Sequence, residues 1–457
     1  MTLFKKYCLT VCASGLVAFA GTSGVMAQTV GMGGKSVTLK DAVAIGVATN
    51  PETGVVQNNR RATDEELAQA KALYMPSVDF SGDTGYEYTD DVGTRAGSDD
   101  DDTESMWRYE AGLTLTQLLF DGYSTKYEIE RQRNRVLSAS HRVRETAEFV
   151  GLDIVEAYLE VIRQRKLLRI ARENVSEHLA ILEQIEDGAS AGRSTRADVE
   201  QAKARVASAK AQEAQVRQAL RIAEATYRRE VGDAPENLEM PMMPVDALTA
   251  NVEEEVKVTM ANSPTLDIFE ADMKVAEAEW RGSGSTLYPQ VDLQLNARQG
   301  NDLGGVDGRD TSASALMVVN WNLYRGGGDQ HRTREFVYRH AESKDNRAEA
   351  ARAVEDDVRQ TWARMEASGE RAREFSSQAA ANAEVVKAYM DQFTLDRRTL
   401  LDVLDAQNEW FVSQSNMINS QFVEIFAVYR LMALKGILLP SLGVDYKAEV
   451  DPADNYQ

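Results

Sequence analysis

The sequence predicts an α+β chain in which one unit, a β-hairpin followed by two very long helices, occurs twice. Three observations support this prediction. Four segments alternate between apolar and polar residues, which is the period of a β-strand with two unlike faces. Residues 123–187 and 329–395 contain no proline and one glycine each, so each can form one unbroken helix. Similar stretches also recur at constant spacing along the chain.

The repeat is visible in short matching stretches. At an offset of 213 residues, Pro51 aligns with Pro264 and Pro76 aligns with Pro289. Further along, at an offset of 204, "LFDGY" (119–123) aligns with "LYRGG" (323–327) and "RSTRADVEQA" (193–202) aligns with "RRTLLDVLDA" (397–406). The change of offset indicates an internal duplication in which nine residues were lost between positions 289 and 323.

The alternating segments are 78–88, 107–119, 291–298 and 313–323. A soluble sandwich could use such strands, but three features favour a membrane barrel. Segments of about 11 to 13 residues are long enough for a tilted strand to cross a bilayer. The connecting loops are polar and unequal, and we expect the longer one, 89–105 with "SDDDD" at 98–102, to face outside the cell.

Aromatic side chains gather at the segment ends, as at the two interfaces of a membrane barrel. One expected rim consists of Tyr74, Phe120, Tyr288 and Tyr324, and the other of Tyr86, Tyr88, Trp107 and Tyr109. Four strands are too few to close a barrel, because about eight are needed. Open strand edges in lipid leave backbone groups without hydrogen bonds. The chain must therefore form an oligomer in which each copy supplies an equal share of strands.

Composition narrows the function. The formal net charge of −21 argues against nucleic acid as a partner, since such binding depends on Lys and Arg. Lys5, Lys6 and the apolar run that follows them predict a secretory signal peptide ending at Ala27. Both cysteines lie within it, so the mature chain uses no disulfide or thiol chemistry. Beyond it no run of 18 apolar residues occurs, so only β-strands could cross a membrane.

These features divide the chain into eight parts. They are a signal peptide (1–27), an N-terminal segment with a first helical region (28–75), a first hairpin (76–122), a first long helical pair (123–232), a connector with an equatorial helical region (233–288), a second hairpin (289–326), a second long helical pair (327–439) and a C-terminal tail (440–457). A helix of 65 residues is about 98 Å long, which no globular core requires. We expect partner helices over 194–230 and 396–438, packed as coiled coils.

This layout resembles the TolC-like outer-membrane export channels over nearly the whole mature chain. The resemblance is carried by "LYMPSVDF" and "LYPQVDLQ" before the hairpins, "LFDGY" and "LYRGG" after them, and "RRTLLDVLDA" at the helical turn. It implies a homotrimer in which a 12-stranded transmembrane β-barrel in the Gram-negative outer membrane continues into a periplasmic tunnel of 12 helices. It also implies two partners, a periplasmic adaptor and an inner-membrane transporter of the ABC or another type. The absence of a lipid-anchor cysteine favours the type I protein secretion branch.

Two aspartates in "RRTLLDVLDA" are the candidate site. Thr195 with Asp198 and Thr399 with Asp402 match the capping box that begins a helix, and capping alone accounts for both aspartates. Asp405 lies one turn further on and has Gln201 as its counterpart, so capping does not explain it.

The resemblance places Asp402 and Asp405 at the pore constriction, where three chains would form a cation-preferring ring of carboxylates. It places Asp198 and Arg398 on the latch of the closed state. Phe393 replaces the family's latch tyrosine and lacks its hydroxyl, and Arg397 and Arg193 are candidates for compensating that loss.

Two other functions remain open: a drug or metal efflux duct of the same fold, and a periplasmic coiled-coil protein that is no channel. Enzyme chemistry is not expected. His141, His178, His331 and His340 are spaced unsuitably for a shared metal site, and "GGG" at 326–328 has no phosphate-binding lysine after it. We therefore expect no catalytic residue, no cofactor and no bound metal.

Overall fold

The computed structural model describes residues 36–90, 92, 104–395 and 397–445. The expected signal peptide and the acidic run at 98–102 lie outside these residues, as does most of the expected C-terminal tail. None of the helices in the described ranges is both long and apolar enough to cross a membrane.

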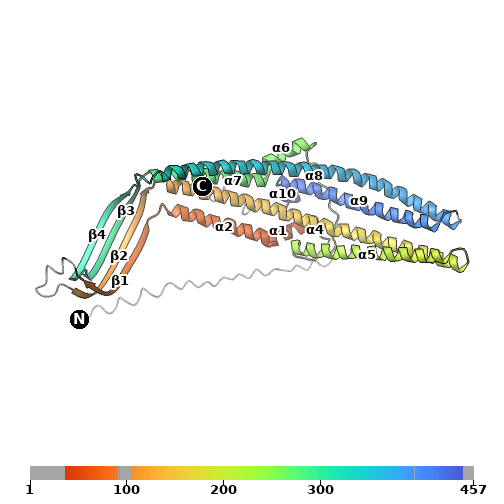
Figure 1. Ribbon diagram of the computed structural model, residues 1–457, viewed down its shortest axis with the longest axis horizontal. Helices are drawn as coiled ribbons and strands as arrows, with labels where there is room; N and C mark the ends of the chain where they lie inside the picture. The colour runs from red at the N-terminus through yellow and green to blue at the C-terminus, as the bar shows by residue number, and fades with distance from the viewer. Residues whose placement is uncertain (1–35, 91, 93–103, 396, 446–457) are drawn as a thin grey trace. The chain divides into compact units, whose positions relative to one another are not determined.

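The elements follow the expected duplication (Figure 1). The first copy contains α1 (Leu39–Thr49), α2 (Pro51–Ala72), β1 (Ser77–Thr89), β2 (Glu104–Phe120), α4 (Ser124–Ser190) and α5 (Arg196–Val231). The second contains α6 (Val252–Asn262), α7 (Pro264–Ser283), β3 (Gln290–Leu303), β4 (Val306–Asn320), α8 (Gly328–Thr394) and α9 (Leu400–Leu434), followed by the short α10 (Leu438–Leu442). Two 3₁₀ turns, Val245–Ala247 and Gly284–Leu287, precede α6 and β3. The internal duplication is confirmed.

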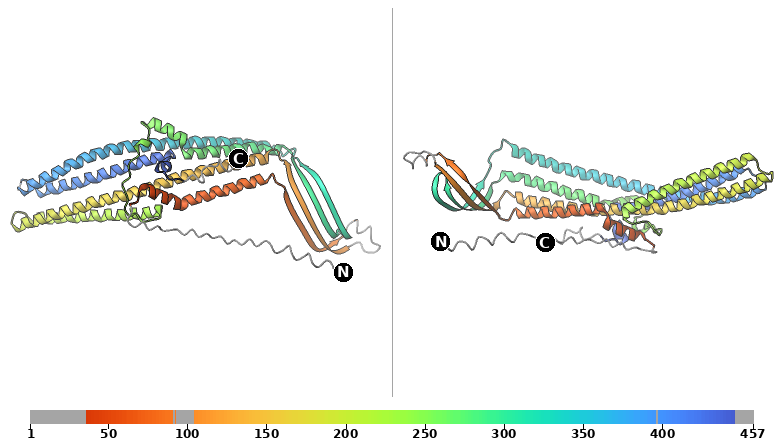
Figure 2. Two further views of the ribbon diagram at one scale, coloured as in Figure 1. Left: turned by 180° about the vertical axis from the view of Figure 1, so that it is seen from behind. Right: turned by 90° about the horizontal axis from the view of Figure 1, so that it is seen from below.

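Helices α4 and α8 each contain 67 residues, which corresponds to about 100 Å. The two views of Figure 2 agree with Figure 1 that α5 lies along α4 and α9 along α8. Both long helices begin after a left-handed turn, formed by Gly122 and Tyr123 in one copy and by Gly326 and Gly327 in the other. The glycine run at 326–328 is therefore a strand-to-helix turn, as expected.

The main core lies where α1, α5, α9 and α10 pack on the middle of α4. Tyr158 of α4 is fully buried in it, and its single hydroxyl proton is shared between the carbonyl oxygens of Glu239 (2.6 Å) and Val37 (2.8 Å). Val37 and Leu238 form a parallel bridge. The connector at Leu238 and Glu239 is therefore held against Val37, at the start of the first copy, and against α4.

The four strands form one antiparallel sheet in the order β1-β2-β3-β4. Gly304 and Gly305, both with positive φ, make the two-residue turn between β3 and β4, whereas residues 90–103 separate β1 from β2. The loss of residues from the second copy therefore shortened the connection between β3 and β4. The fourth strand was expected over 313–323 but spans Val306–Asn320. Trp321 leaves the sheet, and its indole N–H donates to the Leu287 carbonyl at 3.3 Å.

The register gives the sheet one apolar and one polar face. On the apolar face Phe80 pairs with Leu113 and Leu115 pairs with Leu295. On the polar face Thr114 lies opposite Asn296. Within the part of the chain that the structure describes, β1 and β4 each have a strand partner on one side only, so both outer strands keep unpaired backbone groups.

Candidate functional site

The helical turns that carry the predicted site begin with two capping boxes. The Asp402 carboxylate accepts from the Thr399 backbone N–H (3.3 Å) and hydroxyl (2.8 Å), and the Thr399 hydroxyl accepts from the Asp402 N–H (3.3 Å). Asp198 and Thr195 repeat this arrangement at the start of α5. Each aspartate satisfies backbone donors of the first turn and faces the positive end of the helix dipole. The predicted capping boxes are confirmed.

Asp405 makes a different contact. Its carboxylate Oδ1 accepts from Arg205 Nη2 of α5 at 2.7 Å, which joins α9 to α5. Arg205 was not singled out from the sequence. Its counterpart in the second copy is Glu409, which carries the opposite charge. This difference between the two copies is the feature of the sequence that could have identified Arg205. Among the described residues, this pair is the hydrogen-bonded contact that ties Asp405, which the first copy lacks, to the first copy.

The expected latch residues have partners within their own chain. The Arg398 guanidinium stacks on the Tyr389 ring, 4.0 Å from its centroid. Its Nε donates to Gln392 Oε1 at 3.2 Å, and its Nη1 lies 3.9 Å from the Asp402 carboxylate. Among the described residues of one chain, no hydrogen bond or ion pair joins Arg398 to Asp198.

An apolar cluster holds the ends of the two long hairpins together. It combines residues of α4, α5 and α9: Ile181, Ile185, Ala202, Leu400, Val403 and Leu404. Phe393 packs against this cluster. Its ring therefore makes apolar contacts at the position where the resemblance to the export channels predicts a tyrosine. Burial of this cluster fixes how the two turns face each other, and with them the aspartates.

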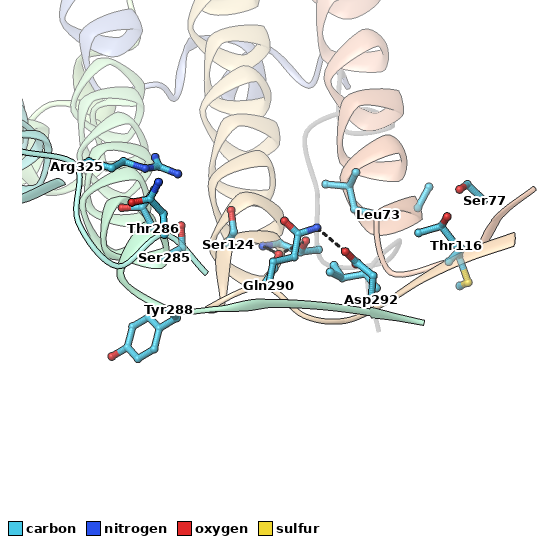
Figure 3. A pocket seen from close by; sticks show the side chains of 16 residues that line it. Leu73, Ser77, Thr116, Ser124, Ser285, Thr286, Tyr288, Gln290, Asp292 and Arg325 are labelled. Carbon is cyan, nitrogen blue, oxygen red and sulfur yellow. Dashed lines mark hydrogen bonds between the residues drawn. The ribbon is translucent and has the colours of Figure 1, made fainter. Parts of the chain in front are cut away.

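A pocket of about 590 Å³ lies where the sheet meets the helices. In Figure 3, Ser77 and Thr116 lie on one side of this pocket and Arg325, which precedes α8, on the other, with Ser124 of α4 and Asp292 of β3 between them. Gln290 Nε2 donates to the buried Asp292 carboxylate at 3.0 Å. The pocket combines polar side chains with the apolar Leu73, Met75 and Leu118, and it sits where the strands give way to the helices.

The expected rim aromatics take two positions along the sheet. Four lie at the ends nearest the helices: Tyr74 after α2, Phe120 at the end of β2, Tyr288 before β3 and Tyr324 after β4. Trp107 lies near the opposite end of β2 and is 63% exposed. The Tyr288 ring points away from the pocket in Figure 3 and is 53% exposed. Tyr74 and Tyr324 are exposed as well, whereas Phe120 is half-buried and packs edge-on against Tyr123.

Comparison with known proteins defines the class. The outer membrane efflux protein family matches residues 47–233 and 256–436, so the chain belongs to that family. It is 25% identical to the outer membrane efflux protein BepC of Brucella suis over 93% of this chain and 91% of that protein. It is 23% identical to the proteases secretion protein PrtF of Dickeya chrysanthemi, over 93% and 92%. The crystal structure of the outer membrane protein VceC of Vibrio cholerae matches with a TM-score of 0.73 and 15% identity, covering 90% of this chain and 97% of that one.

The chain is therefore an outer-membrane export channel of the TolC type, located in the outer membrane of a Gram-negative bacterium, and it is not an enzyme. This confirms the family, fold class and location expected from the sequence.

Proposed function

We propose that three copies of this chain form the outer-membrane duct of a type I protein secretion system. The observation that carries the proposal is the four-stranded sheet, which has one polar face, one apolar face and two unpaired edges and leads into helices of about 100 Å. The similarity to PrtF, a proteases secretion protein, supports polypeptides as the cargo.

Closing the four-stranded sheet into a barrel requires several copies of the chain. Strands β1 and β4 have free edges, and pairing β4 of one copy with β1 of the next supplies the missing hydrogen bonds. Three copies give twelve strands, enough for a barrel with a water-filled interior. The apolar face, with Phe80, Leu113 and Leu295, then contacts outer-membrane lipid, and the polar face lines the pore. Tyr74, Phe120, Tyr288, Tyr324 and Trp107 lie at the two membrane interfaces.

The same symmetry brings three copies of Asp402 and Asp405 around one axis. In this arrangement Asp405 is held by Arg205, and Asp402 holds the first turn of α9. The pore is narrowest there and prefers cations, because rings of carboxylates select them. Arg398, Asp198 and the ring of Phe393 stabilise the closed state between neighbouring turns. Opening requires that α9 separate from α5, which breaks the pair of Asp405 with Arg205. A periplasmic adaptor and an inner-membrane transporter deliver the substrate.

A second candidate is an efflux duct for small molecules, supported by the similarity to BepC, an efflux protein. Deletion of the gene, with complementation by the wild-type chain, separates the two. For secretion, the deletion strain loses one or more polypeptides from its medium, measured by mass spectrometry, and keeps its resistance to drugs and metals. Lost resistance with an unchanged set of secreted polypeptides would contradict the secretion assignment and support efflux.

A further inference from the structure

The polar face of the sheet carries a continuous network of ion pairs that crosses all four strands. We call it the charge belt, and it consists of Asp83, Glu87, Arg108, Glu110, Arg298 and Asp310. These residues come from β1, β2, β3 and β4, and the two furthest apart in sequence, Asp83 and Asp310, are 227 positions apart. The alternation of each strand puts them on the same face of the sheet.

Arg108 joins the first two strands. Its guanidinium contacts the carboxylates of Asp83 at 2.7 Å and Glu87 at 3.2 Å on β1. It also contacts Glu110, two residues along its own strand, at 2.8 Å. Arg108 is thus surrounded by three carboxylates, and its side chain is only 24% exposed.

Arg298 extends the network to the remaining strands. It contacts the second oxygen of Glu110 at 3.3 Å and the Asp310 carboxylate at 2.8 Å. Glu110 therefore bridges the two arginines. Four carboxylates surround two guanidinium groups, which leaves the belt a formal charge of −2 in each chain.

The belt lies away from the helices. Arg108 and Glu110 occupy the first half of β2, next to the hairpin connection, whereas the end of β2 leads into α4. Its two outermost members, Asp83 and Asp310, lie on the edge strands, so the belt ends in a carboxylate at both edges of the sheet.

Stability alone is a weak explanation for this network. Ion pairs on a water-exposed face contribute about 0–1 kcal/mol each, because solvent screens them. The net negative charge is not screened in the same way within a narrow passage, where low-dielectric walls focus the field. The main effect of the belt is therefore on the electrostatic potential of the passage and not on the stability of the sheet.

This inference rests on the proposed trimer, in which the polar face lines the pore. We propose that the charge belt is a second charge filter near the outer mouth, which attracts cations and basic polypeptide segments and repels anions. It acts separately from Asp402 and Asp405 at the helical end. Glu110 is its central member because both arginines contact it.

Planar-bilayer recording with hexaamminecobalt(III) as a trivalent blocker tests the proposal. The protein is added to one chamber, so its helices remain there and the opposite chamber reaches the hairpin end. Glu110→Gln should weaken block from the opposite chamber, and Arg298→Gln should strengthen it, because they change the belt charge in opposite directions. Block from the helical side should stay as in the wild type for both variants and weaken for Asp405→Asn.

The matched control is Glu236→Gln, which removes the same charge from an exposed position of the connector, beside Leu238 and Val37. It should leave block from both sides unchanged. Block from the opposite chamber that is unaffected by both Glu110→Gln and Arg298→Gln, in channels of normal conductance, would overturn the belt filter. If the wild-type chain forms no channel at all, the proposed function fails instead.

Discussion

The ion pair of Asp405 with Arg205 gives the sharpest test of how the channel closes. Arg205→Gln removes the cation that faces Asp405 and keeps a side chain of similar length. Because the 2.7 Å pair joins α5 to α9, its loss should favour separation of the two helices. The variant should therefore conduct more often than the wild type, and the freed carboxylates should increase its preference for cations.

The magnitude follows from the exposure of the pair. The side chains are 35% and 53% exposed, so this is a solvent-screened pair. Such a pair contributes about 0.2–1 kcal/mol. If three copies open together, the closed state loses about 0.6–3 kcal/mol, and the ratio of open to closed channels rises by about threefold to about 150-fold. Single-channel recording measures this ratio, and the reversal potential in a KCl gradient measures selectivity.

Arg217→Gln is the matched control. Arg217 lies on the same helix and pairs only with Glu213 of α5 among the contacts of the described residues, so its loss releases no contact with α9. Its open probability should equal that of the wild type. Arg205→Gln channels with wild-type gating and selectivity would refute the role of the pair. Wild-type selectivity in Asp405→Asn as well would remove Asp405 from the constriction.

Three further predictions concern stability. Thr399→Ala removes the cap of α9 and should destabilise its first turn by about 0.5–2 kcal/mol, measured by amide hydrogen exchange. Lys435→Met leaves Glu255 buried without its 2.7 Å partner and should cost about 3–5 kcal/mol in denaturant unfolding. Burial and the nearby Arg205 charge lower the pKa of His178. The unfolded chain then binds the proton first, so stability should fall as the pH drops below about 6.5, and His178→Gln should remove that loss.

Each of these has its own contrary result. Unchanged exchange at the start of α9 in Thr399→Ala would show that the cap contributes nothing measurable. The double variant Lys435→Met with Glu255→Gln should regain most of the lost stability, and failure to do so would assign the loss to packing. A pH profile of His178→Gln that matches the wild type would locate the acid sensitivity elsewhere.

The long helices and the duplication were predictable because their signals are local and repeated. Absence of proline over 65 residues and the capping boxes at Thr195 and Thr399 determine where helices run and begin. Strand β4 was harder to delimit. Its first residues, from Val306 to Ser312, show no apolar alternation, and backbone pairing with β3 after the Gly304–Gly305 turn makes them a strand.

The contacts between the two repeated units of the chain could not be predicted from the sequence. Arg205 and Asp405 are 200 residues apart, and their meeting depends on the rotation of α5 and α9 about their axes, which the apolar cluster at the hairpin ends sets. The role of Arg398 in a latch between chains stays a prediction from the resemblance; within one chain its guanidinium stacks on Tyr389, nine positions earlier. The charge belt could not be predicted from the sequence either, because the register of four strands determines which charged side chains contact one another.

The central claim is that three copies of this chain close one channel. Native mass spectrometry of the mature protein, extracted from outer membranes in mild detergent, measures the copy number directly. The unpaired edges of β1 and β4 require pairing between copies, and the proposed 12-stranded barrel needs three of them, so a single species of three chains is predicted. A monomer that keeps its sheet and helices intact under the same conditions would contradict the claim.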